Sequence, residues 1–195
     1  MAARAAAFKA VVDALKARGK TTTVVESTAG GLISSSIMAV EGSSAVYQGG
    51  SVAYNTRKCQ PVLLNDADLH ASLLNASAAD ADSYKASKRD WTAKTAVAYC
   101  EAMGTDYAVA EGGAAGPTFR PKGLDSGFSA IAVAARSPDG IKVVRQALCE
   151  SPHARRGDNM ERFATAAARE LLAAATGDVV GRPEVPNALG VTTLI

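Results

Sequence analysis

The sequence predicts an α/β fold in which helices pack on a mixed, mostly parallel sheet. Strand-like and helix-like segments alternate along the chain, a hairpin pattern follows them, and aromatic residues make up only 5% of the 195 residues. Alternating strands and helices are typical of a parallel sheet, and the hairpin adds an antiparallel pair. The abundance of alanine favours helices that pack closely on the sheet.

The N-terminal segments predict a helix, a strand and a second helix. Four apolar residues recur at helical spacing before Gly19, which ends the helix: Phe8, Val11, Val12 and Leu15. Residues 21–26 (TTTVVE) are β-branched and short, as in a strand, and residues 32–40 then form a helix. Gly30 and Gly31 separate these two elements.

The middle of the chain is expected to hold a strand and two further helices. A strand over 46–54 precedes a short helix that Asn65 or Asp66 caps. Residues 75–90 are polar and form a loop or the start of a helix, and a helix follows over 91–103.

The remaining segments predict a strand, a hairpin and a last helix. A strand over 106–110 leads into a glycine-rich turn over 111–117. Residues 128–135 and 141–148 form two strands joined by a Ser-Pro-Asp-Gly turn, which suits a hairpin. Asp158 is expected to cap the final helix.

No repeat or linker divides the sequence, so residues 1–176 are predicted to form one domain. Residues 177–195 form an extended tail, whose apolar and proline-containing sequence suits a strap onto a partner subunit.

Composition excludes several classes of function. A net charge of +2, from 21 basic and 19 acidic residues, is too small for a general nucleic-acid binder. No apolar run approaches the ~18 residues that a membrane span needs. Three cysteines without CxxC or zinc-ligand spacing indicate free thiols in a reducing, cytoplasmic compartment. Asp66, Asp68 and His70 fit an acidic helix start better than a metal site, so no metal or cofactor is expected.

The segment ESTAGG at 26–31 is the strongest local signal for a site. Ser27 follows a strand and precedes two glycines and a helix, so its hydroxyl is expected at the sheet edge where α/β proteins bind ligands. Main-chain N–H groups near Gly30 and Gly31 could receive an oxyanion. An ordinary serine-rich helix cap is the alternative explanation.

Two further features are candidates for the same site. The glycine-rich segment with Gly112 and Gly113 follows another strand, and two such turns can face one crevice. Tyr54 and Lys58 could take a proton from a serine, although a structural tyrosine beside a surface lysine fits the same spacing.

Arg155 and Arg156 stand where a helix begins, a position at which cations oppose the helix dipole. A bound phosphate would offset that unfavourable placement.

Taken together, these segments resemble a known family. ESTAGG at 26–31, EGSSAVYQGGSVAY at 41–54, EGGAAGP at 111–117 and RRGDNMERFA at 155–164 occur in the order found in the C-terminal domain of the competence/damage-inducible protein CinA, the nicotinamide-nucleotide amidase family. The resemblance implies a three-layer domain, a dimer, and hydrolysis of nicotinamide mononucleotide to nicotinate mononucleotide and ammonia, with no metal or cofactor.

The resemblance also implies roles for individual residues. Its serine nucleophile corresponds to Ser27, its tyrosine to Tyr54 and its phosphate-binding arginine to Arg156, with Arg155 beside it. Its lysine lies five residues after the tyrosine, whereas Lys58 lies four after Tyr54.

Two hydroxyl-bearing threonines of the family pattern correspond to Ala29 and Gly112 in this chain. A nucleotide-binding module without turnover therefore stands as the alternative to an amidase, and a general serine esterase as a third hypothesis.

Overall fold

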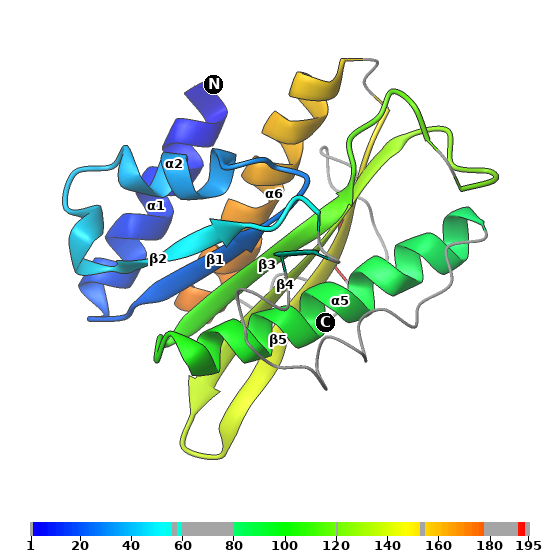
Figure 1. The fold of residues 1–195 in the computed structure, drawn as a ribbon. Coiled ribbons are helices and arrows are strands. Elements are labelled where there is room, and N and C mark those ends of the chain that lie inside the picture. The colour runs from blue at the N-terminus through cyan, green and yellow to red at the C-terminus, as the bar shows by residue number, and fades with distance from the viewer. Residues whose placement is uncertain are drawn as a thin grey trace.

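The computed structural model describes residues 2–55, 58–59, 80–119, 121–152, 155–177 and 191–193. Its elements carry the labels of Figure 1: α1 (Ala2–Ala17), β1 (Thr22–Glu26), α2 (Leu32–Met38), the 3-10 helix η1 (Ser43–Ala45), β2 (Tyr47–Val52), α5 (Ala81–Ala102), β3 (Tyr107–Ala114), β4 (Gly127–Ser137), β5 (Gly140–Ser151), α6 (Arg156–Thr176) and β6 (Val191–Thr193).

The described strands form one sheet in the order β2-β1-β3-β4-β5-β6. Strands β2, β1 and β3 run parallel, and each later strand is antiparallel to its neighbour in this order. The predicted mixed sheet is therefore confirmed. Because β1, β2 and β3 are parallel, their carboxyl ends meet at one edge of the sheet, where ligands bind in α/β folds.

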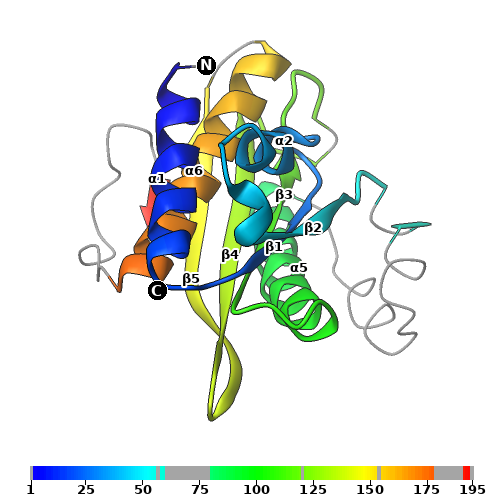
Figure 2. The ribbon, with the colours of Figure 1, turned by 90° about the vertical axis from the view of Figure 1, so that its left-hand side faces the viewer.

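Helices lie on both faces of this sheet, which confirms the predicted three-layer arrangement. Helices α1, α2 and α6 pack together on one face, and α5 crosses the other face over β3, β4 and β5 (Figures 1 and 2). Each face has its own apolar core. The α6 side buries Phe8, Leu15, Ile33, Ile131 and Phe163, among others, and the α5 side buries Val25, Trp91, Ala96 and Cys100 with the alanines of β3 and β4.

The predicted first helix is confirmed as α1. All four apolar residues at its helical spacing, Phe8, Val11, Val12 and Leu15, are fully buried against the sheet and α6. Gly19 follows with φ +59°, a left-handed conformation that glycine adopts without steric cost.

Helix α5 begins much earlier than the sequence predicts, at Ala81 instead of Trp91. Its first turn is closed by a capping box, because the Asp80 carboxylate accepts from Ser83 N at 2.8 Å and Asp80 N donates to Ser83 Oγ at 3.2 Å. The polar residues of this turn thus belong to a capped helix. The helix expected after Asn65 or Asp66 lies outside the described residues.

Strand β3 also runs further than predicted, through Ala114, so Gly112 and Gly113 belong to a strand and not to a turn. The antiparallel neighbour β4 continues the pairing up to Ala114 opposite Phe128. This close approach depends on glycine, since a Cβ on Gly113 would overlap the carbonyl oxygen of Phe128.

The prediction that Asp158 caps the final helix, α6, is wrong. The residue at the N-cap is Arg155, and Asp158 lies in the first turn, where its carboxylate binds the Arg155 guanidinium. In the described part of the predicted tail, β6 pairs antiparallel with β5 of the same chain. Residues 178–190 lie outside the described residues.

We expect Gly113→Ala to lower the free energy of unfolding by roughly 1–3 kcal/mol, the usual cost of overpacking. Gly157→Ala is the matched control, because a Cβ at Gly157 meets no atom within 4 Å and alanine favours a helix by about 0.5–1 kcal/mol. Chemical denaturation of both variants measures the difference. Equal stability of the two variants would contradict the close approach of β3 and β4.

Candidate functional site

Strands β1, β2 and β3 end at one edge of the sheet (Figure 1), and several of the sequence-predicted residues follow or end these strands. Ser27 follows β1, Tyr54 lies two residues beyond β2, and Gly112 lies near the end of β3. The first residue of α6, Arg156, reaches the same edge from the helical layer. The fold therefore brings together residues that are up to 129 positions apart, from Ser27 to Arg156.

Ser27 combines a buried main chain with an unengaged hydroxyl. Its N–H donates to the Glu111 carbonyl oxygen at 3.0 Å, which continues the β1–β3 pairing by one residue. Only 7% of its surface is exposed, and its hydroxyl makes no hydrogen bond within the described residues. The Ser27 Cβ lies 3.7 Å from the point that a Gly112 Cβ would occupy, so Ser27 faces the α5 side of the sheet.

The buried carboxylate of Glu26 holds the start of α2. It accepts main-chain hydrogen bonds from Gly31 (2.8 Å), Ile33 (3.0 Å) and Ser34 (2.9 Å), and a further one from the Ser34 hydroxyl at 2.6 Å. These donors are the N–H groups that a helix start leaves without partners. The Gly31 N–H, predicted as an oxyanion donor, is bound by Glu26 in this structure.

Glu111, the neighbour of Glu26 in the β1–β3 register, holds the preceding residues. Its Oε2 accepts from Ala29 N at 2.9 Å and from Ser27 N at 3.2 Å, and its Oε1 accepts from the Ser129 hydroxyl. Burial raises the pKa of the Glu111 carboxyl above its ordinary value of 4.5, and the nearby Glu26 adds to this rise. The three hydrogen bonds oppose the shift.

Two main-chain N–H groups around Ser27 are left without partners in the described part of the chain, those of Thr28 and Gly30. The N–H of the residue after a nucleophile is a common oxyanion donor in hydrolases that place serine between a strand and a helix. Gly30 has φ +65° and is exposed, and a Cβ there would come within 2.8 Å of Met160 Cε. Thr28 and Gly30 are thus the donors that this loop can offer to a ligand.

Gly112 and Gly113 have no side chains, and other atoms occupy the space where side chains would lie. A Cβ at Gly112 would lie 2.8 Å from Cζ3 of Trp91, so the indole takes up the space of a side chain at this position. The N–H of Gly113 donates to Thr28 Oγ1 at 2.5 Å, which ties the end of β3 to the loop after β1. Gly113 therefore supports the loop and offers no free N–H to a ligand.

Arg156 and Tyr54 form a pair at the rim. The guanidinium donates to the Gly116 carbonyl oxygen at 3.0 Å and to the Tyr54 hydroxyl at 3.4 Å, and it lies 6.0 Å from the centre of the Tyr54 ring. Tyr54 is 68% exposed. These contacts orient the Arg156 guanidinium at the edge of the sheet, with one face toward an exposed aromatic ring.

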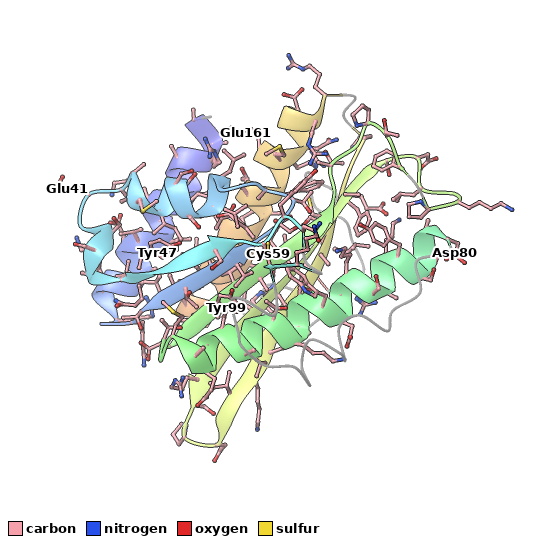
Figure 3. The ribbon with its side chains drawn as sticks, in the orientation of Figure 1. Glu41, Tyr47, Cys59, Asp80, Tyr99 and Glu161 are labelled. Carbon is pink, nitrogen blue, oxygen red and sulfur yellow. The ribbon has the colours of Figure 1, made fainter. Side chains whose placement is uncertain are left out.

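Arg155 and Lys58 are placed differently. The side chain of Arg155 is 84% exposed and forms a two-pronged ion pair with Asp158, at 2.8 and 3.1 Å, so it does not join the site. Lys58 is exposed, and its neighbour Cys59 packs against the core of the α5 side, near Tyr99 (Figure 3).

Sequence reasoning missed the residues that support the loops. Glu26 and Glu111 received no role, although each directly precedes a glycine-rich segment, and this shared position was the available signal. Asn159 was also missed. Its amide donates to Ala115 O at 2.8 Å and accepts from the Ser151 hydroxyl at 2.6 Å, which anchors the end of β3 to α6.

Other kinds of site were sought across the described ranges. No three acidic, histidine or cysteine side chains there gather as metal ligands, and no helix there has the length and apolar character to cross a membrane. Asp66, Asp68 and His70 lie outside the described residues. The cysteines described are free thiols. A pocket of about 740 Å³ lies between α1 and the α2–η1 segment, and its lining contains none of the predicted site residues.

The chain matches the family model of the CinA C-terminal domain over residues 4–175. It is 32% identical over 158 residues to a CinA-like protein of Parasynechococcus marenigrum, covering 79% of this chain and 32% of that protein. A CinA-like protein of Chlorobaculum tepidum is 32% identical over 162 residues, covering 83% and 36% of the two chains. The chain thus spans about a third of the length of these curated relatives.

Solved structures show the same fold. A competence or damage-inducible protein from Enterobacter asburiae matches with a TM-score of 0.67 at 20% identity, covering 88% of this chain and 98% of that chain. The competence/damage-inducible protein CihA from Agrobacterium tumefaciens matches with a TM-score of 0.64 at 20% identity, covering 89% and 96%. At this identity the likeness concerns the fold.

We expect Glu111 to make stability depend on pH. Because its pKa is raised in the native state, the native chain holds a proton that the unfolded chain has lost once the pH exceeds 4.5. Stability should therefore fall as pH rises from 4.5 through the native pKa, by up to about 1.4 kcal/mol per pH unit.

Glu111→Gln should remove this slope, since an amide can accept from Ser27 N and Ala29 N and donate to the Ser129 hydroxyl. Denaturation midpoints measured across pH test this, with Glu41→Gln, at an exposed position, as the control. Parallel pH profiles for wild type and Glu111→Gln would disprove the assignment.

Proposed function

Because the chain belongs to the CinA C-terminal domain family, we propose that the Ser27 pocket hydrolyses the carboxamide of nicotinamide mononucleotide, giving nicotinate mononucleotide and ammonia. One observation carries the proposal. The Ser27 hydroxyl is unengaged and lies in a loop whose only unpartnered N–H groups, within the described residues, belong to Thr28 and Gly30. A nucleophile beside two preorganised donors is the arrangement that acyl transfer requires.

The proposed reaction proceeds through an ester of Ser27. Its oxygen attacks the carboxamide carbon, and the N–H groups of Thr28 and Gly30 stabilise the negative charge that develops on the carboxamide oxygen. Ammonia leaves, and water then hydrolyses the ester. The sequence offers Lys58 or Tyr54 as the acceptor of the serine proton.

Arg156 is the proposed contact for the substrate phosphate. Its guanidinium is held at the rim by Gly116 O and the Tyr54 hydroxyl, and it retains donors that a phosphate can engage. Arg155 is bound to Asp158 and is exposed, so it contributes at most long-range charge.

A nucleotide-binding module without turnover is the second candidate function. It is favoured by Ala29 and Gly112, which place no hydroxyl where the family resemblance implies threonines. Such a module would bind the same mononucleotide through the same rim.

Ser27→Ala is expected to abolish ammonia release from nicotinamide mononucleotide while leaving the thermal midpoint within a few degrees of wild type. A coupled ammonia assay measures turnover, and Ser44→Ala, at an exposed position, serves as the matched control. Wild-type turnover in Ser27→Ala would exclude Ser27 as nucleophile. Stabilisation by the mononucleotide without ammonia from the wild-type chain would favour the binding module.

Arg156→Ala should weaken binding of the mononucleotide by about 1.5–3 kcal/mol, the range for hydrogen bonds to a charged group. Binding of the corresponding nucleoside, which lacks the phosphate, should change little. Arg155→Ala is the matched control and should leave both affinities near wild type, because its guanidinium points to Asp158. Equal losses for nucleotide and nucleoside in Arg156→Ala would show a structural role instead.

A further inference from the structure

Lys88 lies on α5 with its ammonium group between two aromatic rings. Its Nζ is 5.5 Å from the ring centre of Tyr84 and 5.5 Å from that of Trp91, one helical turn away on either side. Lys88 is half-buried. Sequence reasoning gave this lysine no role, because it lies in a polar stretch where a solvated side chain is the ordinary expectation.

Both rings contact the end of β3 beside Ser27. The Tyr84 hydroxyl donates to Gly113 O at 3.4 Å. Cζ3 of Trp91 lies 2.8 Å from the position of a Gly112 Cβ, and the Ser27 Cβ lies 3.7 Å from that same position. Ser27, Trp91 and Lys88 therefore share one face of the sheet, the face that α5 covers.

Lys88 differs from neighbouring lysines in having no acidic partner among the described residues. Lys85 pairs with Glu150 at 2.5 Å, and Lys94 pairs with Asp90 at 2.8 Å, whereas no ion pair involves Lys88. An ammonium group enclosed without a carboxylate is costly, and losing its proton removes that cost.

The charges around Lys88 decide how readily it loses its proton. Burial lowers the pKa of the Lys88 ammonium below its ordinary value of 10.5, and the Glu111 carboxyl of β3 acts in the opposite direction. The other ionisable groups beside Lys88 on α5 are Tyr84, Lys85 and Arg89, and Lys85 is paired with Glu150 of β5.

We propose that Lys88 is the general base that takes the proton of the Ser27 hydroxyl. The proposal rests on the proposed function in one respect, that Ser27 is the nucleophile. Lys88 approaches on the face toward which Ser27 points, whereas Lys58 is exposed and the Tyr54 hydroxyl is bound to Arg156 at the rim.

In this mechanism, Lys88 accepts one proton and returns it in each half of the reaction. Its neutral amine takes the Ser27 proton as the serine oxygen bonds to the carboxamide carbon, and the carbonyl electron pair moves to oxygen. When the carbon–nitrogen bond breaks, the ammonium returns this proton to the departing nitrogen, which leaves as ammonia. Water then gives a proton to Lys88 as it attacks the ester, and Lys88 passes it to the Ser27 oxygen.

Three substitutions in the full chain separate the possible roles of this lysine. Lys88→Met removes both charge and base, and Lys88→Arg keeps the charge but cannot accept a proton near neutral pH. Both should lower turnover of nicotinamide mononucleotide by about 10² or more with little change in KM. Lys94→Met, on the same helix and with a side chain that is 41% exposed, is the matched control and should behave as wild type.

A second readout does not depend on the identity of the substrate. Covalent labelling of Ser27 by a fluorophosphonate requires an activated hydroxyl but no nucleotide. In the wild-type chain, the labelling rate should rise with pH with a midpoint below 10.5, and this rise should vanish in Lys88→Met and Lys88→Arg. Lys94→Met, the control on the same helix, should keep the rise.

The outcomes divide clearly between the two proposals. Labelling that depends on Lys88, without ammonia from the mononucleotide, would disprove the proposed function and support this base. Wild-type labelling of Lys88→Arg would overturn the base and indicate a purely electrostatic role. Loss of labelling in Lys58→Met alone, or no labelling of the wild-type chain at any pH, would also overturn it.

Discussion

Two buried glutamates, Glu26 at the end of β1 and Glu111 within the adjacent parallel strand β3, hold the candidate site together. Glu26 and Glu111 are neighbours in register, and between them their carboxylates bind main-chain N–H groups of Ser27, Ala29, Gly31, Ile33 and Ser34. Burying two carboxyl groups side by side is unfavourable unless hydrogen bonds satisfy them. The loop after β1 supplies those bonds, so the loop conformation and the buried acids depend on each other. Thr28 and Gly30 keep their N–H groups available as a consequence.

Local pattern was enough to predict the α/β class of the fold, its mixed sheet and the position of Ser27. The spacing of Phe8 to Leu15, the β-branched run before Glu26 and the glycines after it are each readable within a few residues. Such signals predict elements because helix and strand periodicity are local properties. They failed at the ends of elements, where caps and neighbouring strands decide. The Asp80 cap extends α5, and pairing with β4 extends β3 through its glycines.

The residues that support the loops could not be predicted from the sequence, for a different reason. A glutamate at the end of an apolar strand looks like the first polar residue of a loop, and only the β1–β3 register shows that Glu26 and Glu111 are adjacent. The same holds for Trp91 and Gly112, which are 21 positions apart and fit together because the indole occupies the space of the missing side chain. Complementarity of this kind between distant positions has no local sequence signal.

The site draws its groups from different layers of the sandwich, and this division bears on how it would work. Arg156 and Tyr54 form the rim on the side of α6, whereas Lys88 and Trp91 come from α5, and Ser27 lies at the edge between them. Under the proposed function, the phosphate end of a mononucleotide is held at the α6 side while its carboxamide is turned toward the α5 side. The loop held by Glu26 and Glu111 lies at the strand edge between these layers, so under the proposed function it sets the distance between the Arg156 rim and Ser27. Under the two proposals, a shift of α5 along the sheet would move Lys88 and Trp91 together and leave Arg156 and Tyr54 in place, so it would change turnover more than affinity.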